Sequence, residues 1–425
     1  MLRSIKHIHF IGVGGIGTSA LAQYYLAKGY TVSGSDAAQS EITDLLKSKG
    51  IRIFIGHSAE NLRGADLVVH PSPAVGPGNE EYDAVKLSSI PTMPYAKALG
   101  EIANGYTTIA ISGSHGKSTT TAMVAKIMID AGLDPTVVVG TKMRELDGNN
   151  FRIGQSEYFV LEADDYDYHF HNYHPAIAVV TNIDREHLDI YKDLDGVKEA
   201  FGKFLQSTKS GGTIIANGQD KNTTDVIKSI DLTLNKVILF NAADLAKHEL
   251  GVPGEHNQSN AEAAYWVGEV LGVKKQSIAK SLAGFRGSWR RLEEITEGVY
   301  SDYAHHPTEI KATLQALKQA NPTKQIVCVF QPHQRDRLNQ LFDDFIGSFE
   351  SADQLYMLPL YAVRGRDEGE GKSSEQLAEL IKTPKAHYEP SFSRAFKAVK
   401  PLMGAQHIVV FMGAGDIDEQ LRAAI

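Results

Sequence analysis

The stretch SGSHGKST combines residue types that can bind a nucleoside triphosphate. The glycines Gly113 and Gly116 let backbone amides turn toward phosphate oxygens at the start of a helix. Lys117 can reach the outer phosphates, and Ser118 can ligate Mg2+. A standard loop of this kind would have its first glycine at Ile111, so the match is to a shortened variant. We predict an ATP-binding loop that comprises Gly113, Ser114, His115, Gly116, Lys117, Ser118 and Thr119.

Polar residues that suit such a loop follow later apolar runs. Glu162, Asp164 and Asp165 end the run in FVLEADD, and His187 follows the next one in TNIDREH. Mg2+ needs few protein ligands, so one carboxylate and one hydroxyl suffice. A nearby group of histidines in DYDYHFHNYH also permits a transition-metal interpretation, although histidines at the rim of a polar cleft are the simpler account. That group comprises His169, His171 and His174.

A different nucleotide motif opens the chain. Gly12, Gly14 and Gly17 form G-x-G-x-x-G after an apolar run, and Asp36 follows after a helix-like segment. This pattern is typical of a dinucleotide-binding unit, and taken alone it indicates NAD. The chain therefore contains two motifs that indicate different nucleotides, a nucleoside triphosphate and NAD.

These motifs require strands that end in polar residues and helices that follow them. Strand-like runs alternate with helix-like segments in three regions, which predicts α/β domains with parallel sheets. The ends of such strands are where open α/β sheets build ligand sites. A length of 425 residues also suggests about three domains. We place their boundaries at residues 1–103, 104–284 and 285–425.

Composition narrows the class of protein. A hydrophobic fraction of 42% and a charged fraction of 22% are typical of a soluble globular protein, and no apolar run reaches the roughly 18 residues of a membrane span. We therefore expect a cytoplasmic protein without a membrane segment. The single Cys328 excludes an internal disulfide and fits a buried, inert thiol. A net charge of -8 argues against nucleic acid as the main partner.

The ordered motifs resemble the Mur ligases, the ATP-dependent amino-acid ligases of bacterial cell-wall precursor synthesis. The motifs are SGSHGKSTTT, EADD, TNIDREHLD, GEHNQSNAEAA, GSWRRLE, SDYAHHPTE and FQPH, and together they cover nearly the whole chain. DYAHHPTE and FQPH are most similar to the members that attach L-alanine to UDP-N-acetylmuramate. EADDYD is closer to a sister group that attaches a tripeptide in recycling.

The resemblance resolves the conflict between the two nucleotide motifs. It implies that the first domain is Rossmann-like and that its glycine turn holds the diphosphate of a UDP-sugar, because backbone amides at a helix start bind any diphosphate. Asp36 would face the uridine or its surroundings, with a turn cap as the alternative. The implied UDP-sugar residues are Gly14, Gly15, Ile16, Asp36 and Ser72.

The resemblance also implies a central P-loop-type ATPase domain, a Rossmann-like C-terminal domain and a two-step reaction with ATP and Mg2+. The lactyl carboxylate of UDP-N-acetylmuramate is phosphorylated, and the amino group of L-alanine then displaces phosphate. Lys117, Glu162 and His187 would be catalytic, with Ser118 and Glu162 binding one metal ion and His187 a second. The implied further contacts to ATP are His256, Asn257, Asn260, Arg290 and Asp302.

The amino-acid pocket is implied at Tyr303, His305 and Arg337. Here the chain departs from its relatives, because Gln334 stands where they usually have an arginine for the amino-acid carboxylate. Arg335, Arg364 or Arg366 would have to compensate for it.

Three other functions remain alternatives to the L-alanine ligase. They are the tripeptide-recycling ligase, an NAD-dependent oxidoreductase and a ligase fold without activity. We expect a monomer or a weak homodimer.

Overall fold

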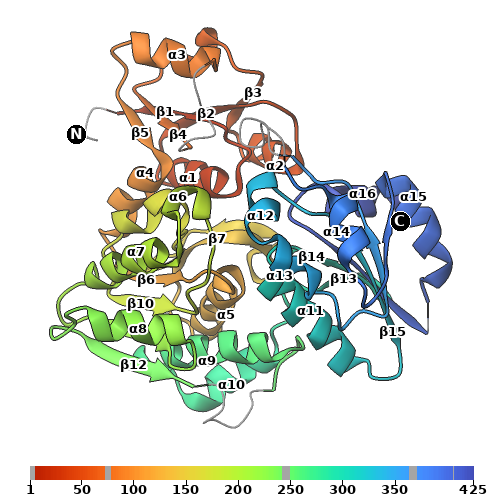
Figure 1. Cartoon of the computed structure of the whole chain (residues 1–425). Coiled ribbons are helices and arrows are strands. Elements are labelled where there is room, and N and C mark those ends of the chain that lie inside the picture. The colour runs from red at the N-terminus through yellow and green to blue at the C-terminus, as the bar shows by residue number, and fades with distance from the viewer. Residues whose placement is uncertain (1–4, 72–77, 242–248, 363–370, 405) are drawn as a thin grey trace. The chain divides into compact units, whose positions relative to one another are not determined.

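The computed structural model describes residues 5–71, 78–241, 249–362, 371–404 and 406–425 (Figure 1). The chain forms two compact units, Met1–Ala246 with Ala261–Ser281 and Lys247–Asn260 with Leu282–Ile425. The first unit contains a five-stranded and a seven-stranded sheet, and the second a six-stranded sheet. The pairing is mainly parallel, which confirms the predicted α/β class. Among the described residues, no helix is long and apolar enough to cross a membrane.

The five-stranded sheet is parallel throughout, in the order β3-β2-β1-β4-β5. Its central strand β1 (His7–Ile11) is almost wholly buried, as expected when both faces of a parallel sheet are covered. The glycine turn follows β1 directly and leads into α1 (Ile16–Ala27). The other elements are β2 (Thr31–Asp36), α2 (Glu41–Ser48), β3 (Arg52–Ile55), η2 (Ala59–Leu62), β4 (Leu67–His70), α3 (Glu80–Leu87), β5 (Thr92–Pro94) and α4 (Tyr95–Ala103).

The seven-stranded sheet has the order β12-β11-β10-β6-β9-β7-β8 and is parallel except for the pair β7–β8. Its central strand β6 (Thr107–Ser112) lies between β9 (Tyr158–Glu162) and β10 (Ile177–Val180). Because these three strands are parallel, the polar residues that follow them meet at one edge of the sheet. The other elements are α5 (Lys117–Asp130), β7 (Thr136–Met143), η3 (Arg144–Leu146), β8 (Asn149–Arg152), η4 (Tyr166–Asn172), α6 (Leu188–Tyr191), α7 (Leu194–Gln206), β11 (Thr213–Asn217), α8 (Lys221–Ser229), β12 (Lys236–Phe240), α9 (Glu255–Val270) and α10 (Lys275–Ala283).

The six-stranded sheet of the second unit has the order β13-β14-β18-β15-β16-β17. Alternate residues of β15 (Gln325–Phe330) enter different cores, Cys328 on one face and Val327 on the other, so both faces are covered. Cys328 is fully buried, which confirms the burial predicted for it, and this burial raises the pKa of its thiol. The other elements are β13 (Glu293–Thr296), β14 (Val299–Asp302), α11 (Pro307–Ala320), α12 (Arg335–Gln340), α13 (Phe342–Ile346), β16 (Gln354–Met357), α14 (Ser374–Leu380), β17 (Ala386–Tyr388), α15 (Phe392–Val399), η5 (Lys400–Leu402), β18 (His407–Met412) and α16 (Ile417–Ala424).

A buried polar cluster ties helix α3 to the five-stranded sheet. Glu81 is fully buried, and its carboxylate lies 2.8 Å from His9 Nε2 and 2.8 Å from His57 Nδ1. The hydroxyl of Ser35 also donates to it, at 2.5 Å. Burial alone would raise the pKa of Glu81, but the hydrogen bonds from His9, Ser35 and His57 outweigh burial and hold the pKa below its ordinary value.

We expect the substitution Glu81→Gln to lower the free energy of unfolding by about 3 kcal/mol at neutral pH, because it removes the charged acceptor of a buried cluster. The folded-state pKa lies below the ordinary value of 4.5, so this contribution is present above about pH 4.5 and is lost as the pH falls through the folded-state pKa. Urea unfolding at several pH values measures both effects.

The exposed neighbour Glu80 provides the control for this prediction. Glu80→Gln should change the free energy of unfolding by less than about 0.5 kcal/mol. Equal stability of the wild-type chain and Glu81→Gln at neutral pH would contradict the role given to the cluster.

Candidate functional site

The predicted ATP loop connects the end of β6 to the start of α5. Gly113 has a φ of +140° and Gly116 a φ of +81°, a region that favours glycine. A Cβ atom at Gly113 would lie 1.9 Å from the side-chain oxygen of Thr181, so a larger residue does not fit there. The loop thus leads into the positive end of a 14-residue helix that has no acidic residue in its first turn, as an anion-binding site requires.

The residues that follow β10 hold this loop in place. Asn182 accepts hydrogen bonds from the backbone amides of Ser114, through its carbonyl at 2.9 Å, and of His115, through its side chain at 2.9 Å. Thr181 donates to the carbonyl of His115 at 2.5 Å, and Asp184 lies 3.0 Å from His115 Nε2. No role was predicted from sequence for Thr181, Asn182 and Asp184, although the polar run TNID after an apolar strand was the available signal.

Lys117 is the charged group of the loop. Its Nζ donates to the carbonyls of Gly113 at 2.6 Å and Ser114 at 3.2 Å and to Asp165 Oδ1 at 2.7 Å. Burial alone would lower the pKa of Lys117, but the nearby carboxylates, Asp165 foremost, outweigh it and raise the pKa. The ammonium group therefore stays charged at neutral pH.

Two of the predicted metal ligands lie together. Ser118 donates to Glu162 Oε1 at 2.8 Å, and the other oxygen of Glu162 accepts from the amide of Gly140 at 2.6 Å. A hydroxyl next to a carboxylate is the kind of oxygen donor set that Mg2+ prefers. The residues present therefore fit a magnesium ion.

The third predicted ligand, His187, lies beside other carboxylates. It has a left-handed backbone conformation, with a φ of 53°, at the start of α6. Its ligand atoms and those of Asp164 and Asp165 lie within 4.8 Å of one another. The structure thus pairs Ser118 with Glu162 and groups His187 with the two aspartates.

The histidines of DYDYHFHNYH do not converge on one point. His169 Nδ1 lies 3.1 Å from Asp164, whereas His171 Nε2 lies 2.8 Å from the carbonyl of Ala200. His174 Nδ1 lies 3.4 Å from the carbonyl of Ser207. Their separate partners argue against the transition-metal interpretation.

The glycine turn after β1 is held by Asp36. The amide of Gly14 donates to Asp36 Oδ2 at 2.8 Å, and a Cβ atom at Gly14 would meet the same oxygen at 2.8 Å. Gly15 caps α1, whose first residue is Ile16 and whose first turn carries no acid. Asp36 thus shapes the predicted diphosphate turn from within, while Ser72 lies outside the described residues.

In the second unit, Arg290 and Asp302 lie at the carboxyl ends of parallel strands. Arg290 Nη2 donates to the carbonyls of Gly413 at 2.6 Å and Gly415 at 3.0 Å, just after β18. Asp302, the last residue of β14, accepts from the amides of Leu292 at 2.7 Å and Ala304 at 2.8 Å, and burial raises its pKa. Both side chains therefore also order the loops around them.

The predicted adenine-side residues begin helix α9. Asn257 donates through its side chain to the carbonyl of Pro253 at 2.7 Å, and Asn260 donates to Asn257 at 3.4 Å. His256 lies next to Gly254, at which a Cβ atom would approach the imidazole ring to 2.6 Å. The helix start thus gathers His256, Asn257 and Asn260 on adjacent turns.

The predicted amino-acid residues gather around His333. The rings of Tyr303 and His305 lie 5.2 Å apart, and those of His305 and His333 lie 6.1 Å apart. Arg337 donates to the carbonyl of His333 at 3.3 Å, and Tyr361 stacks on the ring of His333 at 5.6 Å. His333 belongs to the motif FQPH, but no role was predicted from sequence for it or for Tyr361.

Gln334, at which the sequence predicts a departure from the family pattern, precedes α12. It has a φ of 68°, and its amide donates to the carbonyl of Tyr361 at 3.1 Å. Arg335 begins the helix one residue later. The other two arginines proposed as compensation, Arg364 and Arg366, lie outside the described residues.

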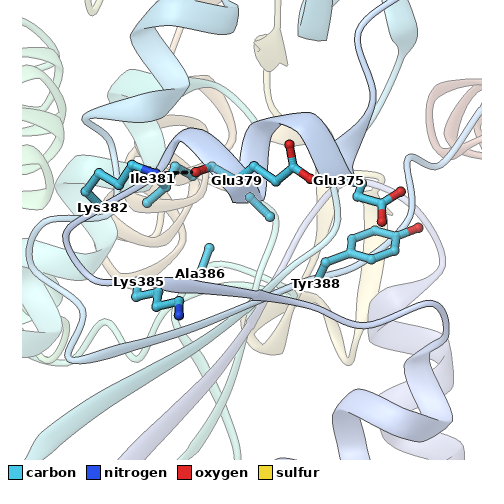
Figure 2. A pocket seen from close by; sticks show the side chains of 8 residues that line it. Glu375, Glu379, Ile381, Lys382, Lys385, Ala386 and Tyr388 are labelled. Atoms are coloured by element: carbon cyan, nitrogen blue, oxygen red, sulfur yellow. Dashed lines mark hydrogen bonds between the residues drawn. The ribbon is translucent and has the colours of Figure 1, made fainter.

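A cavity of about 470 Å³ lies elsewhere in the second unit, between α14 and β17 (Figure 2). Its rim carries both signs of charge, and Lys382 donates to the carbonyl of Glu379 at 2.7 Å. The predicted site residues that the structure describes do not line it. The candidate site is therefore at the strand ends rather than in this cavity.

Three family models match the chain in sequence. They are the Mur ligase family catalytic domain at residues 7–107, the Mur ligase middle domain at 111–249 and the Mur ligase glutamate ligase domain at 290–415. The three matches confirm the predicted architecture of three successive α/β domains.

Relatives and solved structures agree with these matches. UDP-N-acetylmuramate--L-alanine ligases of Aquifex aeolicus and Clostridium tetani are each 40% identical, over 99% and 98% of this chain and 97% of their own length. The crystal structure of UDP-N-acetylmuramate-alanine ligase from Thermotoga maritima has a TM-score of 0.78 at 26% identity and covers 99% of this chain and 100% of that chain. A murein peptide ligase of Psychrobacter arcticus shares the fold, with a TM-score of 0.72 at 23% identity over 99% and 98% of the two chains. The chain belongs to the Mur ligase family.

Proposed function

We propose that the chain joins L-alanine to the lactyl carboxylate of UDP-N-acetylmuramate, with ATP as the energy source. The observation that carries this proposal is the 40% identity, over nearly the whole chain, to ligases named for that reaction. The solved ligase from Thermotoga maritima supports it through the common fold. The tripeptide-recycling ligase is the alternative, and it has less support.

The chemistry follows from the residues of the loop. In the first step a carboxylate oxygen attacks the γ-phosphorus of ATP, the bond to the β-phosphate breaks and ADP leaves. Lys117 and the amides at the start of α5 stabilise the charge on the transferring group. In the second step the amine attacks the acyl carbon, phosphate leaves and the amine loses a proton.

Ser118 and Glu162 are the proposed ligands of a magnesium ion, and His187 is proposed for a second one. Bound there, Mg2+ would neutralise negative charge on the phosphates. Gly140 helps to aim Glu162, because its amide donates to the oxygen that Ser118 does not contact. The hydrogen bond between Ser118 and Glu162 brings the two proposed ligand oxygens within 2.8 Å of each other.

Other residues are proposed on the family resemblance alone. Gly14, Gly15, Ile16, Asp36 and Ser72 are proposed for the UDP-sugar, and Tyr303, His305 and Arg337 for the amino acid. Further ATP contacts are proposed for His256, Asn257, Asn260, Arg290 and Asp302. The domain boundaries at 1–103, 104–284 and 285–425 are proposed likewise.

We expect phosphate release to require both UDP-N-acetylmuramate and an amino acid, with L-alanine preferred over glycine and L-serine. One methyl group in a pocket is worth only about 1 to 3 kcal/mol, so some use of the other two is expected. Steady-state kinetics with these amino acids and with the tripeptide L-Ala-γ-D-Glu-meso-diaminopimelate measure the preference. Because Gln334 replaces the arginine of the family pattern, we expect a higher KM for L-alanine than in a ligase with that arginine, and an unchanged KM for ATP.

Two outcomes would contradict this function. More efficient use of the tripeptide than of L-alanine would establish the recycling activity instead. Tight binding of NADH without binding of UDP-N-acetylmuramate would overturn the interpretation of the glycine turn.

A further inference from the structure

Asp165 is a fully buried carboxylate next to the ATP loop. One of its oxygens, Oδ1, accepts from Lys117 at 2.7 Å, and the other has no hydrogen-bond partner among the described residues. A buried carboxylate is costly to stability unless it is paired, and the hydrogen bond from Lys117 is the short charged contact that offsets this cost.

The backbone around Asp165 is fixed by unusual means. The hydroxyl of Tyr191, itself buried, donates to the carbonyl of Asp165. Two residues further on, Asp167 and Tyr168 have φ values of 49° and 57°, which non-glycine residues rarely adopt. The ring of Tyr168 packs edge-on against that of Tyr191 at 5.0 Å. Strain of this kind persists only where the surroundings enforce it, and it gathers at functional sites.

The three protons of the Lys117 ammonium group have three acceptors in the structure, two carbonyls and one carboxylate. A hydrogen bond between two charged groups is roughly twice as strong as one with a neutral carbonyl. An arriving triphosphate should therefore displace the carbonyls of Gly113 and Ser114 before it displaces Asp165. The ion pair can then persist while the other two donors turn to phosphate.

We propose that Asp165 is a positioning residue, whose fixed carboxylate holds the flexible ammonium group of Lys117 in place during phosphoryl transfer. The inference rests on the proposed function for its kinetic consequences. It adds to that function a group that acts on the reaction only through Lys117.

A competing role for Asp165 is as a ligand for a divalent cation. Its oxygens lie near those of Asp164 and the imidazole of His187, and His187 Nε2 lies 4.0 Å from Asp165 Oδ1. The two roles predict different kinetic effects of a substitution at Asp165. A ligand affects the Mg2+ concentration needed for activity, whereas a positioning residue affects turnover at saturating Mg2+.

The test is the variant Asp165→Asn, which keeps the shape of the side chain and removes its charge. We expect kcat to fall about 10- to 100-fold, as misplacement of a catalytic group does. The KM for ATP should stay within about three-fold, because loss of orientation and loss of repulsion between carboxylate and triphosphate oppose each other. The Mg2+ concentration for half-maximal activity should not change. Asp165→Glu, which keeps the charge, should restore part of kcat.

Asp195→Asn is the matched control, because it removes the same charge from an exposed position on α7 and should leave kcat unchanged. Melting curves show whether each variant folds. If Asp165→Asn does not fold, kcat and the Mg2+ requirement of Asp165→Glu are compared with those of the wild-type chain instead. A wild-type kcat in Asp165→Asn, or in Asp165→Glu where that variant replaces it, would overturn the inference. So would a raised Mg2+ requirement at unchanged maximal turnover.

Calorimetry of Mg2+-ATP binding decides the inference even if the ligase reaction is not found, because it needs neither sugar nor amino acid. In the Lys117→Ala variant there is no ammonium group to orient, so Asp165→Asn removes only the repulsion between the carboxylate and the triphosphate. Asp165→Asn should therefore tighten ATP binding at least about three-fold more in the Lys117→Ala variant than in the wild-type chain. Equal effects in the two backgrounds would overturn the inference. Absence of phosphate release by the wild-type chain would instead overturn the proposed function.

Discussion

Replacement of Lys117 by alanine is expected to reduce kcat by about 10²- to 10³-fold, because it removes the preorganised positive charge that is proposed to stabilise the transferring phosphoryl group. The structure adds a second effect that the loop sequence alone does not reveal. Lys117→Ala leaves Asp165 buried without its partner, and breaking a buried ion pair costs about 3 to 5 kcal/mol of stability. Turnover of both substrates and urea unfolding of the same preparation measure the two effects.

The double variant Lys117→Ala, Asp165→Asn separates stability from catalysis. It should regain much of the lost stability, because no uncompensated buried charge remains, but none of the lost turnover. Lys126→Ala, on the same helix, is the control and should retain wild-type kcat. Near wild-type turnover of Lys117→Ala would contradict the assignment of the loop.

Gly113→Ala is expected to abolish most of the activity as well, by at least about 100-fold, because it moves the backbone amides that are proposed to bind the phosphates of ATP. The added Cβ atom would lie 1.9 Å from Thr181 Oγ1 and 3.0 Å from the backbone nitrogen of Thr181. The φ of +140° is also unfavourable for alanine. Overpacking and strain together should lower the free energy of unfolding by about 2 to 4 kcal/mol.

Gly132→Ala distinguishes the clash from backbone strain alone. Gly132 follows the other end of α5 with a φ of +74°, and no atom of the described residues lies within 4 Å of an added Cβ atom. It should therefore cost about 1 kcal/mol and leave kcat unchanged. If the two variants had equal activity, the close fit of the loop against Thr181 would have no functional importance. Enzyme kinetics and thermal melting of both variants provide the comparison.

The sequence by itself determined the α/β class and the family, and it predicted where the ATP loop lies. These follow from local patterns, because the spacing of glycines, a lysine and a serine in SGSHGKST lies within one turn between a strand and a helix. Alternating strands and helices likewise predict parallel sheets from short-range information. The buried role of Cys328 was predictable for the same reason, since it lies inside an apolar run.

The partners of these residues were decided only by the tertiary structure. Lys117 meets Asp165 at a distance of 48 residues in sequence, and His115 meets Asn182 at 67. Both contacts depend on the strand order β10-β6-β9, which places the ends of strands distant in sequence side by side.

Three further contacts were also decided by the tertiary structure. They are the hydrogen bond from Gly14 to Asp36, the hydrogen bond between His9 and Glu81, and the stacking of the rings of His333 and Tyr361. Local sequence patterns specify each strand and its polar end, but not which strands become neighbours. That choice is made by burial of whole sheet faces, and it brings distant side chains within hydrogen-bond reach.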